Sequence, residues 1–248
     1  MKTGACYVPV DANAPGPRLE EIGRQCAFRA LISSHELYQK LSGSFHHECP
    51  MNAIYFIDKA PEAALPLPAL TFADNLPQQS SEDPAVPVID NDLAYILFTS
   101  GSTGVPKRVM LSHLTRCHLS TGGCETFGIT ANDRLSNHAP FNFDLSVFDI
   151  FVAVKAGAAI SLVPEGLAVF PLQLSSFIQD QKITVWYSVP MVLALLQARG
   201  RLEERDLAAL RRSDAGDSEG KSHEIIQRDW AMRKIQLAPF STPATNRH

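Results

Sequence analysis

Residues 93–107 read LAYILFTSGSTGVPK, an apolar run that ends in a cluster of hydroxyl and glycine residues. A near-continuous apolar run of this length predicts a strand that is covered on both faces. Glycine tolerates the positive φ angles of a tight turn, so the chain can reverse direction after this strand. Successive N–H groups in such a turn converge on an anion, and the hydroxyls and the lysine add further donors. The segment therefore predicts a phosphate-binding loop made of Thr99, Ser100, Gly101, Ser102, Thr103, Gly104 and Lys107.

The spacing of this loop differs from that of the common nucleotide-binding motifs. The pattern GxxxxGK[ST] requires a glycine directly before the lysine, where this chain has Pro106. A GxGxxG pattern for a dinucleotide is also absent from the sequence. An ordinary β-turn is the alternative interpretation of a glycine-rich segment of this kind.

Short apolar runs alternate with helical patterns over most of the chain. Strands are expected at residues 7–10, 29–33, 53–57, 93–99, 158–163 and 184–189. Helices are expected at residues 18–27, 113–127, 145–155, 172–181 and 191–197. This alternation predicts an α/β fold in layers, with largely parallel sheets.

Two segments differ from the rest in composition. Six prolines lie between Pro61 and Pro87, which predicts a surface connection over residues 59–91. Residues 213–248 contain 10 charged residues among 36, a higher share than the 19% of the whole chain. This composition predicts a tail that is poorly ordered or only partly helical, so the folded domain is expected over residues 1–212.

The composition also argues against several classes of protein. The 248 residues carry a net charge of -4, so no basic surface for nucleic acid is expected. The longest apolar stretch, residues 147–163, is interrupted by Asp149, Lys155 and Gly157, which favours a buried helix and strand over a membrane span. The first ten residues, MKTGACYVPV, do not have the pattern of a secretory signal.

The five cysteines are odd in number and show no CxxC spacing. They are typical of reduced thiols in a cytoplasmic protein. The stretch FHHECP at residues 45–50 places two histidines near Cys49, but no second ligand pair follows at the spacing of a zinc site. No metal-ligating residues are therefore predicted.

Four segments resemble motifs of one enzyme family. They are YILFTSGSTGVPKRVMLSH (95–113), KTGACYVPVDANAPGPRLEEI (2–22), HAPFNFDLSVFDIFVAVKAGAAISLVPE (138–165) and ITVWYSVPMVLALL (183–196). In their order and content they resemble the adenylate-forming superfamily, which includes acyl-CoA synthetases, luciferases and the adenylation domains of nonribosomal peptide synthetases. The resemblance covers residues 2–212 and implies part of the large N-terminal lobe of such an enzyme.

This resemblance implies a reaction and its cofactors. In the superfamily a carboxylate attacks the α-phosphate of ATP, pyrophosphate leaves, and the acyl group passes to the thiol of a carrier protein's phosphopantetheine or of coenzyme A. ATP and Mg²⁺ are the implied cofactors, and residues 99–104 with Lys107 are implied to hold the phosphates. The family usually has glycine after the lysine, and Arg108 in its place is expected either to stiffen the loop or to add charge.

The segment FNFDLS resembles the Phe-Asp-x-Ser motif of the members that activate amino acids. In those members the aspartate pairs with the substrate's α-ammonium group, so the resemblance assigns Phe143 and Asp144 to the substrate. From the residues alone, the favoured interpretation is that Asp144 caps a helix that starts at Leu145, and the resemblance reverses this preference. His138 either lines the substrate channel or is structural, and Asp149 either supports a neighbouring polar group or is solvated.

The resemblance stops near Arg212. The later motifs, namely the magnesium-holding glutamate, the ribose-binding aspartate and the C-terminal lobe with its catalytic lysine, have no counterpart in the sequence, so no catalytic residue is assigned. We therefore expect a truncated ligase that is inactive alone. The alternatives are an acyl-CoA synthetase-type ligase, a non-catalytic phosphate- or nucleotide-binding module, an interaction fragment and, with the least support, a phosphotransferase.

Overall fold

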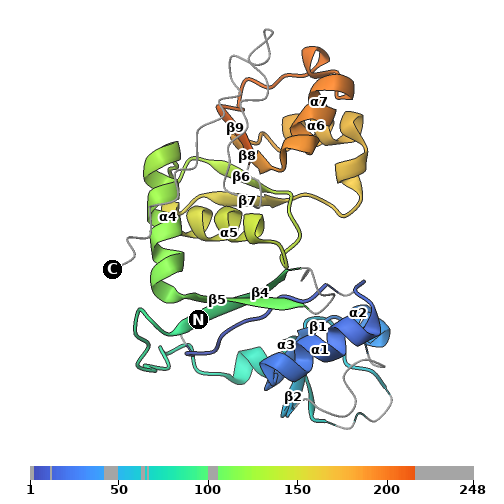
Figure 1. Cartoon of the computed structure of the whole chain (residues 1–248), viewed down its shortest axis with the longest axis vertical. Coiled ribbons are helices and arrows are strands. Elements are labelled where there is room, and N and C mark those ends of the chain that lie inside the picture. Colours follow the sequence, from blue (N-terminus) through green and yellow to red (C-terminus); the bar gives the residue numbers. More distant parts are fainter. Residues whose placement is uncertain are drawn as a thin grey trace. The chain divides into compact units, whose positions relative to one another are not determined.

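The computed structural model describes residues 3–11, 13–41, 50–62, 65, 67–99 and 106–215. The chain divides into two compact units, Met1–His113 and Leu114–His248 (Figure 1). Within the described ranges, no helix combines the length and the apolar character that a membrane span requires.

The first unit contains a small parallel sheet with helices between its strands. Its elements are α1 (Gly16–Cys26), β1 (Ala30–Ser33), α2 (His35–Leu41), β2 (Ala53–Phe56), β3 (Ala69–Thr71), α3 (Phe72–Asn75) and a 3-10 turn (Leu76–Gln78). Strand β2 pairs with β1 on one side and with β3 on the other, in parallel in both cases. Its residues Ile54 and Phe56 are buried, and Tyr38 of α2 packs edge-on against Phe56 with ring centroids 5.4 Å apart.

The same unit contains an antiparallel pair, β4 (Leu93–Thr99) and β5 (Lys107–Ser112). Strand β4 is the apolar run expected from the sequence, and its central residues are buried. The strand expected at residues 7–10 is wrong, because in this region Tyr7 alone forms a bridge, to Tyr95 of β4. Pro9, two residues later, has no N–H group to donate to a ladder.

The second unit is a four-stranded parallel sheet in the order β7-β6-β8-β9. Helix α4 (His113–Phe127) begins at the last residue of the first unit. The elements after it are β6 (Arg134–Asn137), α5 (Asp144–Ala156), β7 (Ala159–Leu162), a 3-10 turn (Leu167–Val169), α6 (Pro171–Asp180), β8 (Val185–Ser188), α7 (Pro190–Arg199), a second 3-10 turn (Leu202–Glu204) and β9 (Arg212–Ala215). Parallel pairing in both units confirms the predicted α/β fold with largely parallel sheets.

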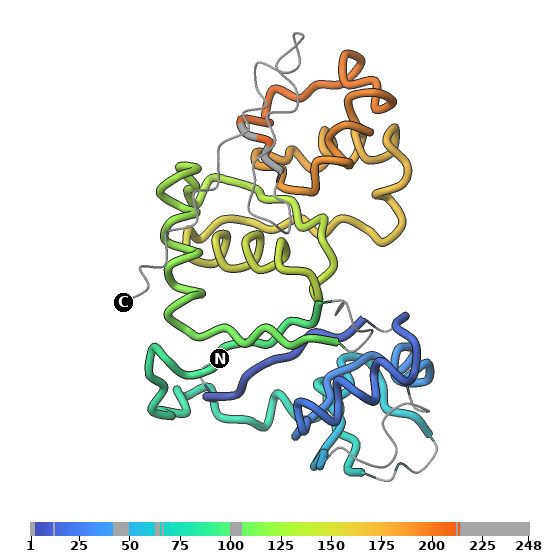
Figure 2. The backbone as a smooth tube through the Cα atoms, in the orientation of Figure 1, coloured from blue at the N-terminus to red at the C-terminus, as the bar shows by residue number. Residues whose placement is uncertain are grey.

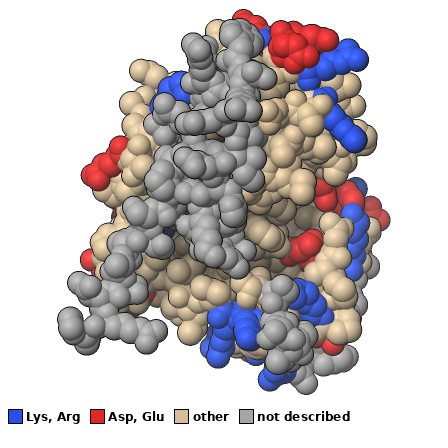
Figure 3. Space-filling model, turned by 45° about the horizontal axis from the view of Figure 1, so that its top comes forward, with Lys and Arg blue, Asp and Glu red and all other residues tan. Residues whose placement is uncertain are grey.

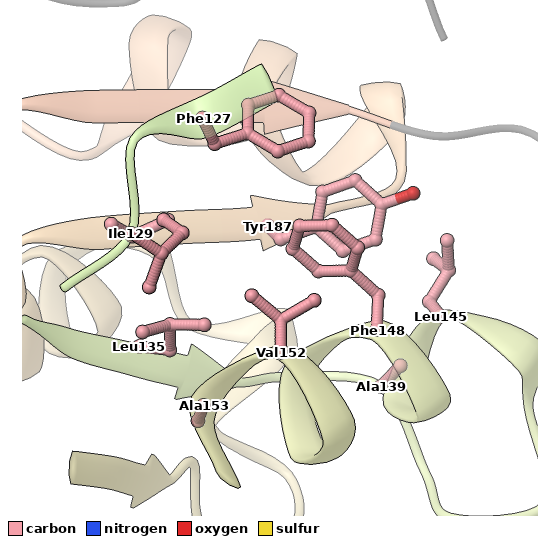
Figure 4. Packing of buried hydrophobic residues seen from close by; sticks show 10 residues of the cluster. Phe127, Ile129, Leu135, Ala139, Leu145, Phe148, Val152, Ala153 and Tyr187 are labelled. Atoms are coloured by element: carbon pink, nitrogen blue, oxygen red, sulfur yellow. The ribbon is translucent and has the colours of Figure 1, made fainter. Parts of the chain in front are cut away.

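Side chains that alternate along β8 belong to cores on opposite faces of this sheet. Val185 and Tyr187 lie in a core with residues of α4, α5 and β6 (Figure 4). Trp186, between them, lies in a core with residues of α6 and α7. Since neighbouring strand residues point to opposite faces, the helices must cover both faces of the sheet. This explains why β6 and β8 are almost fully buried, whereas β7, at the edge of the sheet, exposes Ala159 and Leu162.

Helices α4 and α5 pack closely on their shared face. At Gly123 of α4, a Cβ atom would lie 2.6 Å from Cγ2 of Val152. A side chain at this position would therefore force the two helices apart. Helix α5 ends at Gly157, whose φ of 71° is a left-handed conformation that glycine adopts without strain.

An ion pair joins the amino ends of three neighbouring strands in this unit. Asp133, Thr184 and Arg211 directly precede β6, β8 and β9. Arg211 donates from Nε and Nη2 to the two carboxylate oxygens of Asp133, each at 2.7 Å, and Thr184 Oγ1 donates to Asp133 Oδ1 at 2.7 Å. Arg211 also donates to the carbonyl oxygens of Phe127 and Gly128. We refer to Asp133, Thr184 and Arg211 as the strand-end lock.

Candidate functional site

The strand order of the second unit reverses at β6. The chain leaves β6 through α5 to β7 on one side, then passes through α6 to β8 on the other side, a path that can be followed in Figure 2. Parallel α/β sheets bind ligands at the carboxyl ends of their strands, at the point where the order reverses. This rule places a candidate site beyond Asn137 of β6 and Ser188 of β8.

The loop from β6 to α5 is fixed by its own hydrogen bonds. The N–H of Phe143 donates to the carbonyl oxygen of Pro140 at 2.9 Å. The buried Ser146 donates from Oγ to the carbonyl oxygens of Phe143 at 2.6 Å and Phe141 at 3.2 Å. The serine of the FNFDLS segment therefore shapes the turn from which Asp144 projects.

Asp144 is exposed at the first residue of α5 and has no hydrogen-bond or ion-pair partner among the described residues. The cap position belongs to Phe143, and no side-chain cap is formed. The interpretation of Asp144 as the cap of a helix starting at Leu145 is therefore wrong. The positive end of the helix dipole favours a carboxylate at this position, and an exposed, unpaired carboxylate is available to a cationic group.

Aromatic residues flank Asp144 in the sequence. The rings of Phe141 and Phe143 are 52% and 50% exposed. Phe148 follows Asp144 by four residues, the spacing that brings side chains together on one side of a helix. Its ring centroid lies 4.6 Å from that of Tyr187. Figure 4 shows the two rings next to each other. A carboxylate next to such residues suits a small molecule that combines a cation with an apolar body.

His138 is the first residue after β6 and is partly buried. Its ring lies 5.5 Å from that of Trp186, and its Nε2 is buried without a hydrogen-bond partner among the described residues. Burial lowers the pKa of this imidazole, which favours the neutral form. Trp186 belongs to the core under α6 and α7, so His138 packs on that face, and its role in a substrate channel stays a prediction.

Asp149 is a buried polar residue of α5 whose surroundings the sequence left open. Its side chain is 0% exposed, so the solvated interpretation is wrong. Asn137 donates from Nδ2 to Asp149 Oδ2 at 3.1 Å and to the carbonyl oxygen of Ala139 at 3.3 Å. The pair thereby ties α5 to the start of the loop that leads to Asp144. The sequence signal for Asp149 is one carboxylate inside the apolar run VFDIF, whereas nothing in the sequence marks Asn137 as its partner.

Of the predicted phosphate-binding residues, Thr99 and Lys107 lie opposite each other at the end of the β4–β5 pair. Thr99 Oγ1 donates to the carbonyl oxygen of Lys107 at 3.5 Å, and the Lys107 side chain is exposed. Ser100, Gly101, Ser102, Thr103 and Gly104 lie outside the described residues. Thr99 and Lys107 belong to the first unit, whereas His138, Phe143 and Asp144 lie between the end of β6 and the start of α5 in the second.

Within the described residues, no group of three or more His, Cys, Asp or Glu side chains gathers in a way that could hold a metal ion. Cys6, Cys26, Cys117 and Cys124, the cysteines within the described ranges, form no disulfide. The face seen in Figure 3 carries basic and acidic side chains in separate small groups.

Comparisons with known proteins identify relatives of this chain in sequence and in fold. An L-proline--[L-prolyl-carrier protein] ligase of Pseudomonas fluorescens is 37% identical over 202 residues, which are 82% of this chain and 39% of that protein. A protein of the same name from Streptomyces coelicolor is 31% identical over 213 residues, 85% of this chain and 40% of that protein. The crystal structure of the Vibrio cholerae adenylation domain AlmE in complex with glycyl-adenosine-5'-phosphate has a TM-score of 0.69 and 28% identity, and covers 87% of this chain and 42% of AlmE.

The chain spans about two-fifths of the length of these relatives. The family model of AMP-binding enzymes matches residues 1–224, which is most of the chain. The order of the motifs, the parallel α/β fold and this match lead to one conclusion: the chain belongs to the family of AMP-binding enzymes.

Proposed function

We propose that this chain carries the amino-acid-binding and phosphate-binding parts of an ATP-dependent ligase that activates an amino acid. The observation that carries the proposal is the unpaired carboxylate of Asp144 at the start of α5. It lies beside apolar residues at the carboxyl edge of a parallel sheet, where such folds bind small molecules. An α-ammonium group would supply the cation that this carboxylate lacks.

The proposed reaction is the activation of a carboxylate by adenylation. A carboxylate oxygen of the amino acid forms a bond to the α-phosphorus of ATP, the bond from that phosphorus to the bridging oxygen breaks, and pyrophosphate leaves. A thiolate then attacks the acyl carbon and AMP leaves. We propose that residues 99–104 and Lys107 hold the phosphates, since a lysine and backbone N–H groups stabilise the charge of the departing pyrophosphate. We propose ATP and Mg²⁺ as the cofactors, as membership of the AMP-binding enzymes implies.

The substrate we propose is L-proline or an amino acid of similar size. Two relatives named as L-proline--[L-prolyl-carrier protein] ligases support this choice. Leu145, Phe148 and Tyr187 are buried in one apolar core (Figure 4). Phe141 and Phe143, within three residues of Asp144 in the sequence, are exposed. An apolar surface of this kind suits a small ring without polar groups. By the same likeness, the acceptor is the phosphopantetheine thiol of a carrier protein in the cytoplasm.

Calorimetric titration of the 248-residue chain tests the proposal. The probes are L-proline, its ring-oxygen analogue tetrahydrofuran-2-carboxylate, and 5'-O-(L-prolylsulfamoyl)adenosine, a stable mimic of prolyl-adenylate. We expect Asp144→Asn to weaken binding of both prolyl compounds about 10- to 100-fold, the usual cost of losing a charged hydrogen bond. The control is Asp180→Asn, which removes an exposed carboxylate from α6 with the same change in net charge.

The oxygen analogue separates recognition of the ammonium group from other effects. It lacks the cation, so it should bind weakly and with equal affinity to the wild type and to Asp144→Asn. Binding of L-proline that is insensitive to Asp144→Asn would refute the proposal. Saturable ATP binding without any binding of amino acids would instead support the non-catalytic phosphate-binding alternative.

A further inference from the structure

The segment that follows the predicted phosphate loop is held by helix α1 at two points. Gln25 donates from Nε2 to the carbonyl oxygen of Pro106 at 3.3 Å. Arg108 donates from Nη1 to the carbonyl oxygen of Gln25 at 3.0 Å. The two bonds therefore run in opposite directions between one residue of α1 and the residues on both sides of Lys107.

The surroundings of Gln25 and Pro106 favour both of these hydrogen bonds. The amide group of Gln25 is oriented by Glu21, whose Oε1 accepts from Gln25 Nε2 at 2.6 Å. The carbonyl oxygen of Gln25 lies in the last turn of α1, where carbonyl groups have no partner within the helix. A guanidinium group at a helix C-terminus also interacts favourably with the helix dipole. Pro106 is buried, so its carbonyl group does not depend on bulk water.

The alternation of side chains along β5 determines how the contact with α1 affects Lys107. Successive residues of a strand point to opposite faces, so Arg108 and Lys107 project from opposite sides of β5. Arg108 reaches α1, which leaves Lys107 on the other side, where its side chain is exposed beside Thr99. We propose that Gln25 and Arg108 form a clamp that positions Lys107 for phosphate binding. The clamp rests on the proposed function, because that function assigns Lys107 to phosphate.

Arg108 stands where the family resemblance leads one to expect glycine, which has no side chain to make this bond. Of the two roles that the sequence left open for Arg108, the structure favours stiffening of the segment by hydrogen bonding. If the added charge were the role, the guanidinium would be directed toward the phosphate side of the strand rather than toward the end of α1. Arg108 and Gln25 are therefore positioning residues in this proposal, and Lys107 is the residue that contacts phosphate.

Two single variants test the clamp by separate routes. Gln25→Leu removes the donor to Pro106 without changing any charge, and Arg108→Met removes the donor to Gln25 but keeps an unbranched side chain. The control is Arg29→Met, which removes an exposed positive charge from the same unit outside the clamp. Amide hydrogen exchange at residues 107–109 reports the local order of the segment. Calorimetric titration with inorganic pyrophosphate reports the placement of Lys107.

We expect exchange at residues 107–109 to be about fivefold faster in both clamp variants, the effect of one lost hydrogen bond. Pyrophosphate should bind about fivefold more weakly to Gln25→Leu, although that variant keeps every charge. Arg29→Met should resemble the wild type in both measurements. Unchanged exchange in the clamp variants would overturn the clamp, and faster exchange with unchanged pyrophosphate affinity would overturn its positioning role.

The two readouts separate this inference from the proposed function. Exchange measures the clamp whether or not phosphate binds. A wild-type chain that does not bind pyrophosphate would refute the phosphate-binding part of the proposed function and, with it, the positioning role. If exchange were still faster in the variants of such a chain, the two hydrogen bonds of the clamp would be supported, but their role in phosphate binding would not.

Discussion

At the scale of single residues, Asp149 has an unusual position for a carboxyl group. It is fully buried, one oxygen accepts from Asn137, and the other has no hydrogen-bond partner among the described residues. Burial raises the pKa of this carboxyl well above its ordinary value, and the bond from Asn137 only partly opposes the shift. The native protein therefore keeps a proton that the unfolded chain releases.

This retained proton predicts a pH dependence of stability that Asp149→Asn removes. In the wild type, the free energy of unfolding should fall as pH rises above the unfolded pKa of about 3.9, until the native pKa is reached. The asparagine variant has no such proton, so its stability relative to the wild type should increase with pH, by at most about 1.4 kcal/mol per pH unit. Urea denaturation of both proteins at several values between pH 5 and pH 8 measures this difference.

His138 changes the free energy of unfolding with pH in the opposite direction, over part of the same pH range. Burial lowers the pKa of its imidazole below 6.5, so its contribution to stability is present at higher pH and is lost as pH falls through 6.5 toward the native pKa. Because His138 is present in both proteins, its effect cancels in their difference. If the free energies of unfolding of the wild type and of Asp149→Asn differed by a constant amount from pH 5 to pH 8, Asp149 would not retain a proton.

At the scale of secondary-structure elements, the strand-end lock determines how β6, β8 and β9 are held at their amino ends. Burial alone would raise the pKa of Asp133, but hydrogen bonds from Arg211, the backbone of Thr130 and Thr184 outweigh it and hold that pKa well below the ordinary 3.8. The Asp133 side chain is 5% exposed and that of Arg211 is 38% exposed. Loss of the arginine would leave an almost buried carboxylate without its cation.

We therefore expect Arg211→Met to lower the free energy of unfolding at pH 7 by about 2 to 3 kcal/mol. This is less than the roughly 3 to 5 kcal/mol expected when a fully buried ion pair is broken, because solvent partly screens the arginine. The control is Arg201→Met, which breaks an exposed pair with Glu204 and should cost less than about 1 kcal/mol. Urea denaturation measures both values.

The pH dependence identifies the carboxylate as the origin of this effect. A carboxyl with a lowered native pKa stabilises the protein above its unfolded pKa of about 3.9, and this contribution is lost as pH falls. The gap between wild type and Arg211→Met should therefore narrow when denaturation is repeated below pH 4. A gap that stays constant would mean that packing of the arginine, rather than its pairing with Asp133, provides the stability.

Hydrophobic patterning predicted the elements whose buried residues are apolar. The strand at Leu93–Thr99 and the helix at His113–Phe127 have the expected bounds, and β1, β2, β7, β8, α1, α5, α6 and α7 lie within a few residues of them. Strand β6 was missed because Ser136 and Asn137 are buried polar residues in its centre and at its end. Strand β5 was missed because its first residues are charged and exposed.

The candidate site was predictable only where neighbouring residues carry the signal. Asp144 and the phosphate loop each lie in a short segment whose order of residues resembles a family motif. The partners that fix these segments lie far away in the sequence, such as Gln25, which is 81 residues from Pro106. A glutamine in a helix and an arginine in a strand show no pattern that would pair them, so these contacts required the fold.

At the scale of the whole molecule, each of the two compact units contains a hydrophobic cluster of its own. In the first unit, Tyr38, Ile54 and Phe56 form one buried cluster. In the second, the two faces of the sheet carry the clusters that include Leu135 and Trp186. Each unit therefore buries apolar surface of its own, which is the basis of independent cooperative unfolding.

Differential scanning calorimetry should resolve two unfolding transitions for the chain. Phe56→Ala should destabilise the first unit by about 3 to 5 kcal/mol, and Leu135→Ala should destabilise the second by about 2 to 5 kcal/mol, because both side chains are almost completely buried. Each variant is expected to lower the midpoint of a different transition. If both variants shifted one common transition, the chain would unfold as a single cooperative unit.

The strand-end lock also affects the order of events during synthesis. Asp133 leaves the ribosome 78 residues before Arg211, and β6, α5, β7 and β8 all emerge in between. The early strands can pair while the chain is still growing. Until Arg211 emerges, however, the carboxylate of Asp133 must remain hydrated at the end of an open sheet. The ion pair of the strand-end lock therefore forms late in synthesis, after β6, α5, β7 and β8 have emerged and just before β9 does.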